Sequence, residues 1–304
     1  MSGALLEVTI HTFLNFDNLA ELLPLVAGSL AAGVILGLIA GVIGPMIHAR
    51  DLAFAVHGTS ELSFAGAAAA LYFGASVTAG AIGGSLLAAL LLGVLGVRAR
   101  HRNATIGILL PFGLGIGVLF LALYTGRSSN KFGLLAGQIV AVESSQLTTL
   151  AIVAAVIAVV LIPIWRPLFF ASVDPEVAQA RGVPVRWLSI AFMLVLGLAV
   201  AMSVQLVGAL LVLSLLITPT AAAARLTVRP FMLSLLSVVF AITAAVGGIV
   251  LSLGPGLPIS PYVTTVSFAI FGICALIGHL RERRGWNRRP DAGHHPHADA
   301  LHTH

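Results

Sequence analysis

Charged residues are scarce in this chain. Of its 304 residues, 9% are charged and 59% are hydrophobic, and the mean hydropathy is +1.05. About a quarter of the residues of a soluble domain are charged, so this composition cannot cover a surface that faces water. Disorder is excluded as well, because disordered chains hold far less apolar matter. The composition therefore predicts a polytopic membrane protein. Its long apolar runs predict an all-α helix bundle.

Cysteine, lysine and nucleotide-binding motifs are scarce or missing. The single cysteine, Cys274, excludes an internal disulfide scaffold. Lys131 is the only lysine, and the sequence has no G-x-x-x-x-G-K-[ST] phosphate-binding loop. We therefore expect no enzyme activity in this chain, and active transport would need an ion gradient or a separate ATPase. The N-terminus has no basic start, so we expect no cleavable signal peptide.

Nine apolar runs predict transmembrane helices. They occupy about residues 23–47, 57–74, 76–97, 104–124, 147–165, 187–204, 206–224, 231–253 and 262–280. We expect a turn around Ser203 and Gln205 to separate the sixth run from the seventh. The runs divide the chain into an extracytoplasmic segment (1–22), a transmembrane domain (23–280) and a basic, histidine-rich cytoplasmic tail (281–304).

The basic residues favour an orientation with the N-terminus outside and the C-terminus in the cytoplasm. Of the 16 basic residues, only Arg127 and Lys131 then fall outside, which leaves 14 inside. The net charge of +5 thus reflects membrane topology, and we expect no nucleic-acid partner. On the outer side we expect an interfacial or re-entrant segment at 130–146 and a proline-rich loop at 255–263.

Glycines at helical spacing predict close helix packing. They lie on single faces of the first, third and fourth runs: Gly33, Gly37 and Gly41; Gly80 and Gly84; Gly113 and Gly117. Such faces suit either a compact bundle around a central path or ordinary membrane packing.

His57 and Glu61 are the main ionisable residues inside the predicted bundle. They are four residues apart, so on a helix they share a face. An ionisable residue within a membrane is a functional candidate, and an imidazole with a carboxylate suits Zn²⁺ or Mn²⁺. The alternative is a structural pair in which His57 caps the helix at the interface. Thr59 and Ser60 either orient the pair or bond back to the helix backbone.

The longest cytoplasmic loop, 166–187, predicts a short helix at about 172–183. Asp174 and Glu176 are placed to stabilise its positive end, with a proline in its first turn. Gly182 ends this helix. A helix lying along the inner face suits a docking element, and the alternative is a long ordered loop.

The tail is rich in histidine. Flexible imidazole-rich segments bind transition metals loosely. We expect a metal buffer or sensor here, although an unselected polar tail or a purification tag would have a similar composition. The residues concerned are His294, His295, His297, His302 and His304.

Three stretches resemble the ABC-3 family of metal-uptake permeases, and the likeness covers most of 23–280. The stretch QLVGALLVLSLLITPTAAAARL (205–226) is similar to the family's seventh-span pattern, and FGLLAGQIVAV (132–142) to its L-x-G-D/N-I-L-x-V segment. The predicted loop helix is similar to the family's coupling helix, which docks the ATPase. The matching residues there are Asp174, Glu176, Ala178 and Gly182.

The second run resembles the family's D-x-x-S-H-A-x-x-P-G pattern with two ligands exchanged. His57 stands where an Asp is usual, and Glu61 stands where a His is usual. The family's proline position holds Ala65. By this resemblance, the family's metal-contacting pair falls on His57 and Glu61, which still provide one imidazole and one carboxylate.

The resemblance implies the permease subunit of an ATP-binding-cassette importer in a prokaryotic-type cell membrane. The cargo would be a divalent transition metal, zinc or manganese, with no permanently bound cofactor. The partners would be a cytoplasmic ABC ATPase, an extracytoplasmic metal-binding protein, a second permease copy and membrane lipid. The alternatives are a gradient-driven secondary carrier, an ABC permease for iron or a metal chelate, and a membrane enzyme.

Overall fold

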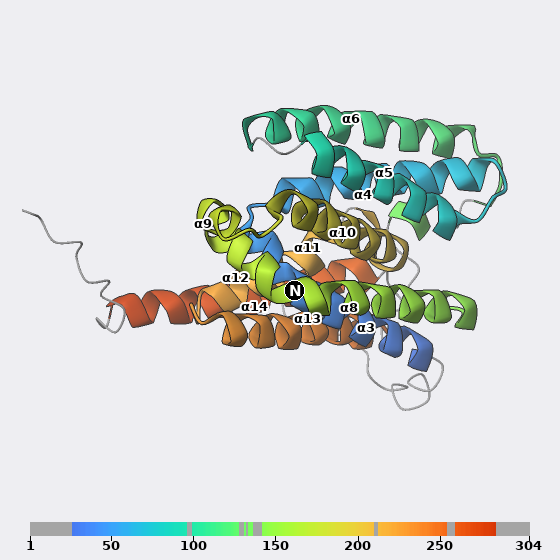
Figure 1. Cartoon of the computed structure of the whole chain (residues 1–304). Coiled ribbons are helices and arrows are strands. Elements are labelled where there is room, and N and C mark those ends of the chain that lie inside the picture. The colour runs from blue at the N-terminus through green and yellow to red at the C-terminus, as the bar shows by residue number, and fades with distance from the viewer. Residues whose placement is uncertain are drawn as a thin grey trace, which may run out of the picture.

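The protein is an all-α bundle (Figure 1). The computed structural model describes residues 26–95, 99–127, 131, 133–135, 142–209, 212–253 and 259–283, and all regular structure in these ranges is helical. The helices are α3 (Ala27–Ala49), α4 (Ala53–Tyr72), α5 (Val77–Leu95), α6 (Ala99–Leu123), α8 (Ser144–Val173), α9 (Pro175–Ala180), α10 (Val185–Val207), α11 (Val212–Leu216), α12 (Thr218–Ala224), α13 (Pro230–Leu253) and α14 (Ile259–Arg283). The predicted fold class is confirmed.

Seven of the described helices are long and apolar enough to cross a membrane: α3, α5, α6, α8, α10, α13 and α14. The two other predicted spans correspond to α4 and to the pair α11 and α12. Neither meets both conditions, because α4 is not apolar enough and the helices α11 and α12 are too short.

Helix α4 is long enough but polar. Its 20 residues span about 30 Å at 1.5 Å per residue. It begins at Ala53, so His57 lies inside the helix rather than at its start. Thirteen of its 20 residues are buried, because α5 and α6 pack along it. Protein rather than lipid therefore surrounds its polar side chains, and this makes a polar span tolerable.

The predicted seventh span is broken, and the predicted turn before it is wrong. Helix α10 continues to Val207, so Ser203 and Gln205 lie in a helix. The Ser203 hydroxyl donates to the backbone oxygen of Ala199 at 2.8 Å. The helix ends at Gly208, whose φ of 90° strongly favours glycine. The chain then resumes as the short helices α11 and α12.

Two predicted loops are partly helical. The first is the loop 166–187, because helix α8 extends through Pro163 and Pro167 to Val173. The 30 residues of α8 exceed the length that the hydrocarbon core requires. Helix α14 begins at Ile259, so the second half of the predicted loop 255–263 is its first turn. A proline in a first turn costs no hydrogen bond. Eight of the 17 residues of the predicted 130–146 segment lie outside the described residues, and its last three residues, 144–146, are the first turn of α8.

Close packing at the predicted glycine faces is confirmed. A Cβ on Gly37 would lie 2.8 Å from the Ile242 Cα atom of α13. A Cβ on Gly113 would lie 2.8 Å from the Cδ1 atom of Leu62 in α4. At such distances a side chain at either position would force the helices apart.

Helices α4, α5 and α6 form one side of the bundle, and α3, α8, α13 and α14 form the other, with α10 between them (Figure 1). Helices α3 and α10 are the most enclosed spans, with 67% and 72% of their windows buried, against 17–33% for the other five. Helix α10 packs against both sides, and α3 is enclosed by α8, α13 and α10 on its own side.

The described basic loops gather at one end of the bundle. Arg50, after α3, donates hydrogen bonds to Ser172 of α8 and Ser189 of α10, so these three helix ends meet. A Cβ on Gly278 of α14 would lie 3.0 Å from the backbone oxygen of Arg225, which follows α12. Figure 1 shows α9, α12 and the C-terminal end of α14 at this same end. The predicted positive-inside orientation requires this grouping.

Candidate functional site

His57 and Glu61 form a pair on one face of α4. The His57 Nδ1 atom lies 3.8 Å from the Glu61 Oε1 atom. The spacing of four residues brings the two side chains together, as the sequence predicts. The gap is longer than a good hydrogen bond, so neither group satisfies the hydrogen-bonding capacity of the other.

The two side chains differ in burial. The Glu61 side chain is 4% exposed, whereas the His57 side chain is 34% exposed. The carboxylate therefore lies inside the bundle and the imidazole at its edge. Among the described residues, the Glu61 Oε2 and His57 Nδ1 atoms have no hydrogen-bond partner. A buried carboxylate oxygen without a partner is costly, and a bound cation would remove that cost.

The two hydroxyls beside the pair behave differently. The Ser60 hydroxyl donates to the backbone oxygen of His57 at 2.7 Å, so it bonds back to the helix. The Thr59 Oγ1 atom is buried and has no hydrogen-bond partner among the described residues. Thr59 is therefore the hydroxyl whose proton is not already donated to the helix backbone.

Helix α6 approaches the pair closely because it carries a glycine there. A Cβ on Gly113 would lie 3.1 Å from the Glu61 Cβ atom and 3.0 Å from the Glu61 backbone carbon. Ile106 of the same helix packs on α4 at Gly58, where an added Cβ would lie 3.3 Å from its Cγ2 atom. The absence of a side chain at Gly113 lets α6 enclose the carboxylate.

The described part of the chain offers two candidate metal ligands at this point, His57 and Glu61. No group of three or more His, Cys, Asp and Glu side chains within it is placed to hold a metal ion. A zinc or manganese ion takes at least four ligands. The pair is therefore suited to transient binding along a path, with water or other groups completing the coordination.

The predicted docking helix is present as α9, and it is shorter than expected. Residues 172 and 173 belong to α8, and α9 begins after Asp174. The Asp174 Oδ1 atom accepts a hydrogen bond from the Val177 N–H at 3.0 Å, and Pro175 occupies the first turn. Gly182, with a φ of 80°, follows the helix end. Both predicted boundary signals are confirmed.

The predicted docking residues of α9 divide by burial. Glu176 is exposed and Asp174 is half-buried, whereas Ala178 is completely buried. Ala178 therefore anchors α9 to the bundle, and a partner would meet the face that carries Glu176 and the 42% exposed Val177.

Arg50 is a structural residue that sequence reasoning counted only as a charge. Its Nε atom donates to the Ser172 Oγ atom at 2.7 Å, and its Nη1 atom donates to the Ser189 Oγ atom at 3.1 Å. Its guanidinium carbon lies 5.6 Å from the ring centre of Phe192. Arg50 thus joins α3 to the two helices that flank α9. No local pattern signals this, because the serines are more than 120 positions away.

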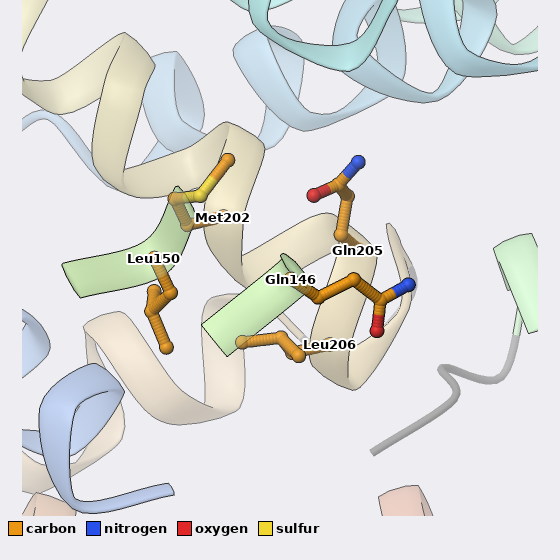
Figure 2. Close-up of a pocket in the computed structure, with 5 residues that line it drawn as sticks. All are labelled: Gln146, Leu150, Met202, Gln205 and Leu206. Carbon is orange, nitrogen blue, oxygen red and sulfur yellow. The ribbon is translucent and has the colours of Figure 1, made fainter. Parts of the chain in front are cut away.

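A small cavity lies between α8 and α10, at the end of the bundle opposite α9. Figure 2 shows its lining, with Gln146 and Leu150 from α8 and Met202, Gln205 and Leu206 from α10. Its volume is about 10 Å³, enough for one water molecule. Gln146 is already engaged, because its Oε1 atom accepts a hydrogen bond from the Glu143 N–H in a capping box.

The histidines of the predicted metal-binding tail lie outside the described residues. Their expected role stays a prediction from composition.

Comparisons with known proteins agree with this architecture. The family model described as the ABC 3 transport family matches residues 23–278. The manganese transport system membrane protein MntC of Halalkalibacterium halodurans is 31% identical over 225 residues, which are 74% of this chain and 77% of that protein. The high-affinity zinc uptake system membrane protein ZnuB of Buchnera aphidicola is 27% identical over 238 residues, 78% of this chain and 91% of that protein.

A solved structure shares the fold. PsaBC from Streptococcus pneumoniae, in complex with Fab, superposes with a TM-score of 0.75 at 25% identity. The match covers 85% of this chain and 94% of the compared chain.

Proposed function

The chain belongs to the ABC 3 transport family, and on this premise we propose that it is the membrane permease subunit of an importer that moves zinc or manganese into the cytoplasm. Relatives named for manganese and zinc transport support this cargo. The described membrane helices place the chain in the cell membrane. ATP hydrolysis belongs to a separate subunit in this proposal.

The observation that carries the proposal is the buried pair in α4. Glu61 is a carboxylate with an unpartnered oxygen, enclosed by α6, and His57 lies one turn away at the bundle edge. In this proposal the cation passes from water to these two groups and then onward. A pair of ligands binds a metal weakly enough to release it, which transport requires.

The proposal assigns docking of a cytoplasmic ATPase to α9. Its exposed face carries Glu176 and Val177, while the buried Ala178 ties it to the bundle. An extracytoplasmic metal-binding protein would deliver the ion at the opposite end, and a second permease copy would complete the importer. The tail histidines would receive or report imported metal.

Metal uptake by cells that lack their own copy tests the proposal. We expect His57→Ala and Glu61→Ala each to abolish accumulation of radioactive zinc or manganese, with normal amounts of the protein in the membrane fraction. The matched controls are His48→Ala and Glu143→Gln, which change exposed residues of the same kinds. Normal uptake in either α4 variant would exclude the pair from the path.

Exchanging the two ligands tests the site more finely. The double variant His57→Asp with Glu61→His restores the order of the family pattern and keeps one carboxylate and one imidazole, so we expect it to retain uptake. The single variant His57→Asp offers two carboxylates and should favour manganese, whereas Glu61→His offers two imidazoles and should favour zinc. An unchanged zinc-to-manganese ratio in both single variants would show that the pair does not contact the metal.

A further inference from the structure

A long apolar groove runs along the bundle on the side away from α5 and α6. It has a volume of about 1310 Å³ and is formed by α3, α8 and the start of α13. Ile35 and Ile157 belong to its aliphatic wall. On its rim, Leu38 is 43% exposed and Ile162 is 74% exposed. In a membrane-spanning bundle such a surface faces lipid tails rather than water.

The lining of the groove changes along α8. On α8 it is apolar at Ala151, includes Trp165 and Arg166 fifteen residues later and continues as far as Val173, and Ser234, one turn into α13, also contributes to it. Fifteen helical residues correspond to about 22 Å. A whole bilayer with its head groups is about 40–45 Å thick, so this length matches one leaflet, tails and head group together.

Arg166 gives the lining of the groove a positive charge. Its side chain is exposed, and no described residue forms a salt bridge with it. A guanidinium group matches a phosphate with two parallel hydrogen bonds. Tryptophan is enriched at the level of lipid head groups, and basic pockets between spans bind acidic head groups.

We propose that this groove binds one acidic phospholipid. The phosphate lies at Arg166 beside Trp165, and the acyl chains lie along α3, α8 and α13. A second copy of the chain fits less well. A two-fold interface presents the same patch on both sides, so two such grooves would face each other across a hollow and bring their arginines together.

Native mass spectrometry of the purified full chain in detergent tests this assignment. The probes are dioleoyl-phosphatidylglycerol, which is acidic, and dioleoyl-phosphatidylcholine, which is not. We expect one bound phosphatidylglycerol, held at least about tenfold more tightly than phosphatidylcholine, because its head group has a net negative charge whereas the choline ammonium of phosphatidylcholine neutralises the phosphate and repels Arg166. Phosphatidylglycerol should also raise the unfolding temperature, since it binds the folded state.

Three variants locate the site. Arg166→Gln should lower the affinity for phosphatidylglycerol to near that for phosphatidylcholine. Ala158→Trp fills the groove and should weaken the binding of both lipids. Arg181→Gln removes the same charge from the exposed end of α9, outside the groove, and should change neither.

Two results would overturn the proposal. Equal affinity for the two lipids, or unchanged phosphatidylglycerol binding in Arg166→Gln, would mean that the groove has no head-group site. Dissociation of a dimer by Ala158→Trp would assign the groove to a second copy. If Ala158→Trp does not fold, as judged by its helical circular dichroism, Arg166→Gln still decides the question. None of these measurements depends on metal uptake.

Discussion

The contacts of Arg50 lead to a quantitative prediction about stability. This side chain connects the end of α3 to the last turns of α8 and the first turns of α10, through Ser172 and Ser189. Replacing Arg50 with Met keeps a long apolar side chain but removes both hydrogen bonds and the charge over Phe192. The substitution therefore separates the polar contacts from simple packing.

The size of the effect follows from the geometry. Two hydrogen bonds from a charged donor are worth about 1.5–3 kcal/mol each, and the arginine–ring contact adds about 0.5–2 kcal/mol. Arg50 is half-buried, so its loss also removes the cost of partly desolvating a charge. We expect the free energy of unfolding to fall by about 3 kcal/mol after this offset.

Unfolding in mixed micelles with increasing dodecyl sulfate, followed by circular dichroism, measures the change. Arg186→Met, at an exposed position near the start of α10, is the matched control and should shift stability by less than about 0.5 kcal/mol. Ser189→Ala should cost about 1 kcal/mol in the native background and almost nothing beside Arg50→Met.

Two results would refute this reasoning. One is a loss below about 1 kcal/mol for Arg50→Met, since that is less than one charged hydrogen bond. The other is an equal cost of Ser189→Ala in both backgrounds, because the two residues would then be energetically independent.

Three further predictions concern packing, the α9 cap and the tail. Gly113→Ala should destabilise the protein by about 1–3 kcal/mol, because its Cβ would clash with α4. The control Gly115→Ala, whose Cβ would lie in open space, should be neutral or slightly stabilising. Equal effects of the two variants in the same unfolding assay would contradict the close approach of α6. Asp174→Ala should lower the stability by about 1 kcal/mol and speed proteolysis at α9, because it removes the helix cap. Asp174→Asn keeps a capping oxygen and should change neither. A cleavage rate that is unchanged in both variants would argue against the cap. Deleting residues 291–304 should lower cellular zinc or manganese only in part, as measured by elemental mass spectrometry, and loss of membrane insertion would show that the tail has a structural role.

The candidate pair and the short helix α9 were both accessible to local reasoning. His57 and Glu61 are four residues apart, and any helix through them places them on one face. Asp174 and Gly182 bracket α9 because capping and positive φ depend on a few neighbouring residues. The break after α10 was predicted a few residues too early, around Ser203 and Gln205. The residue that marks its position is Gly208, with a positive φ, rather than the polar Ser203 and Gln205.

The sequence by itself determined the class of protein, because the apolar content of a chain decides whether it is stable in water or in a membrane. The charges of its loops predicted its orientation. It also determined which helix faces pack closely, since only glycine permits that approach. The tertiary structure alone decided which residues distant in the chain meet. It brought Arg50 to Ser172 and Ser189, packed α6 against Glu61, and formed the groove that Arg166 lines. These features depend on the packing of several helices at once, which no local pattern encodes.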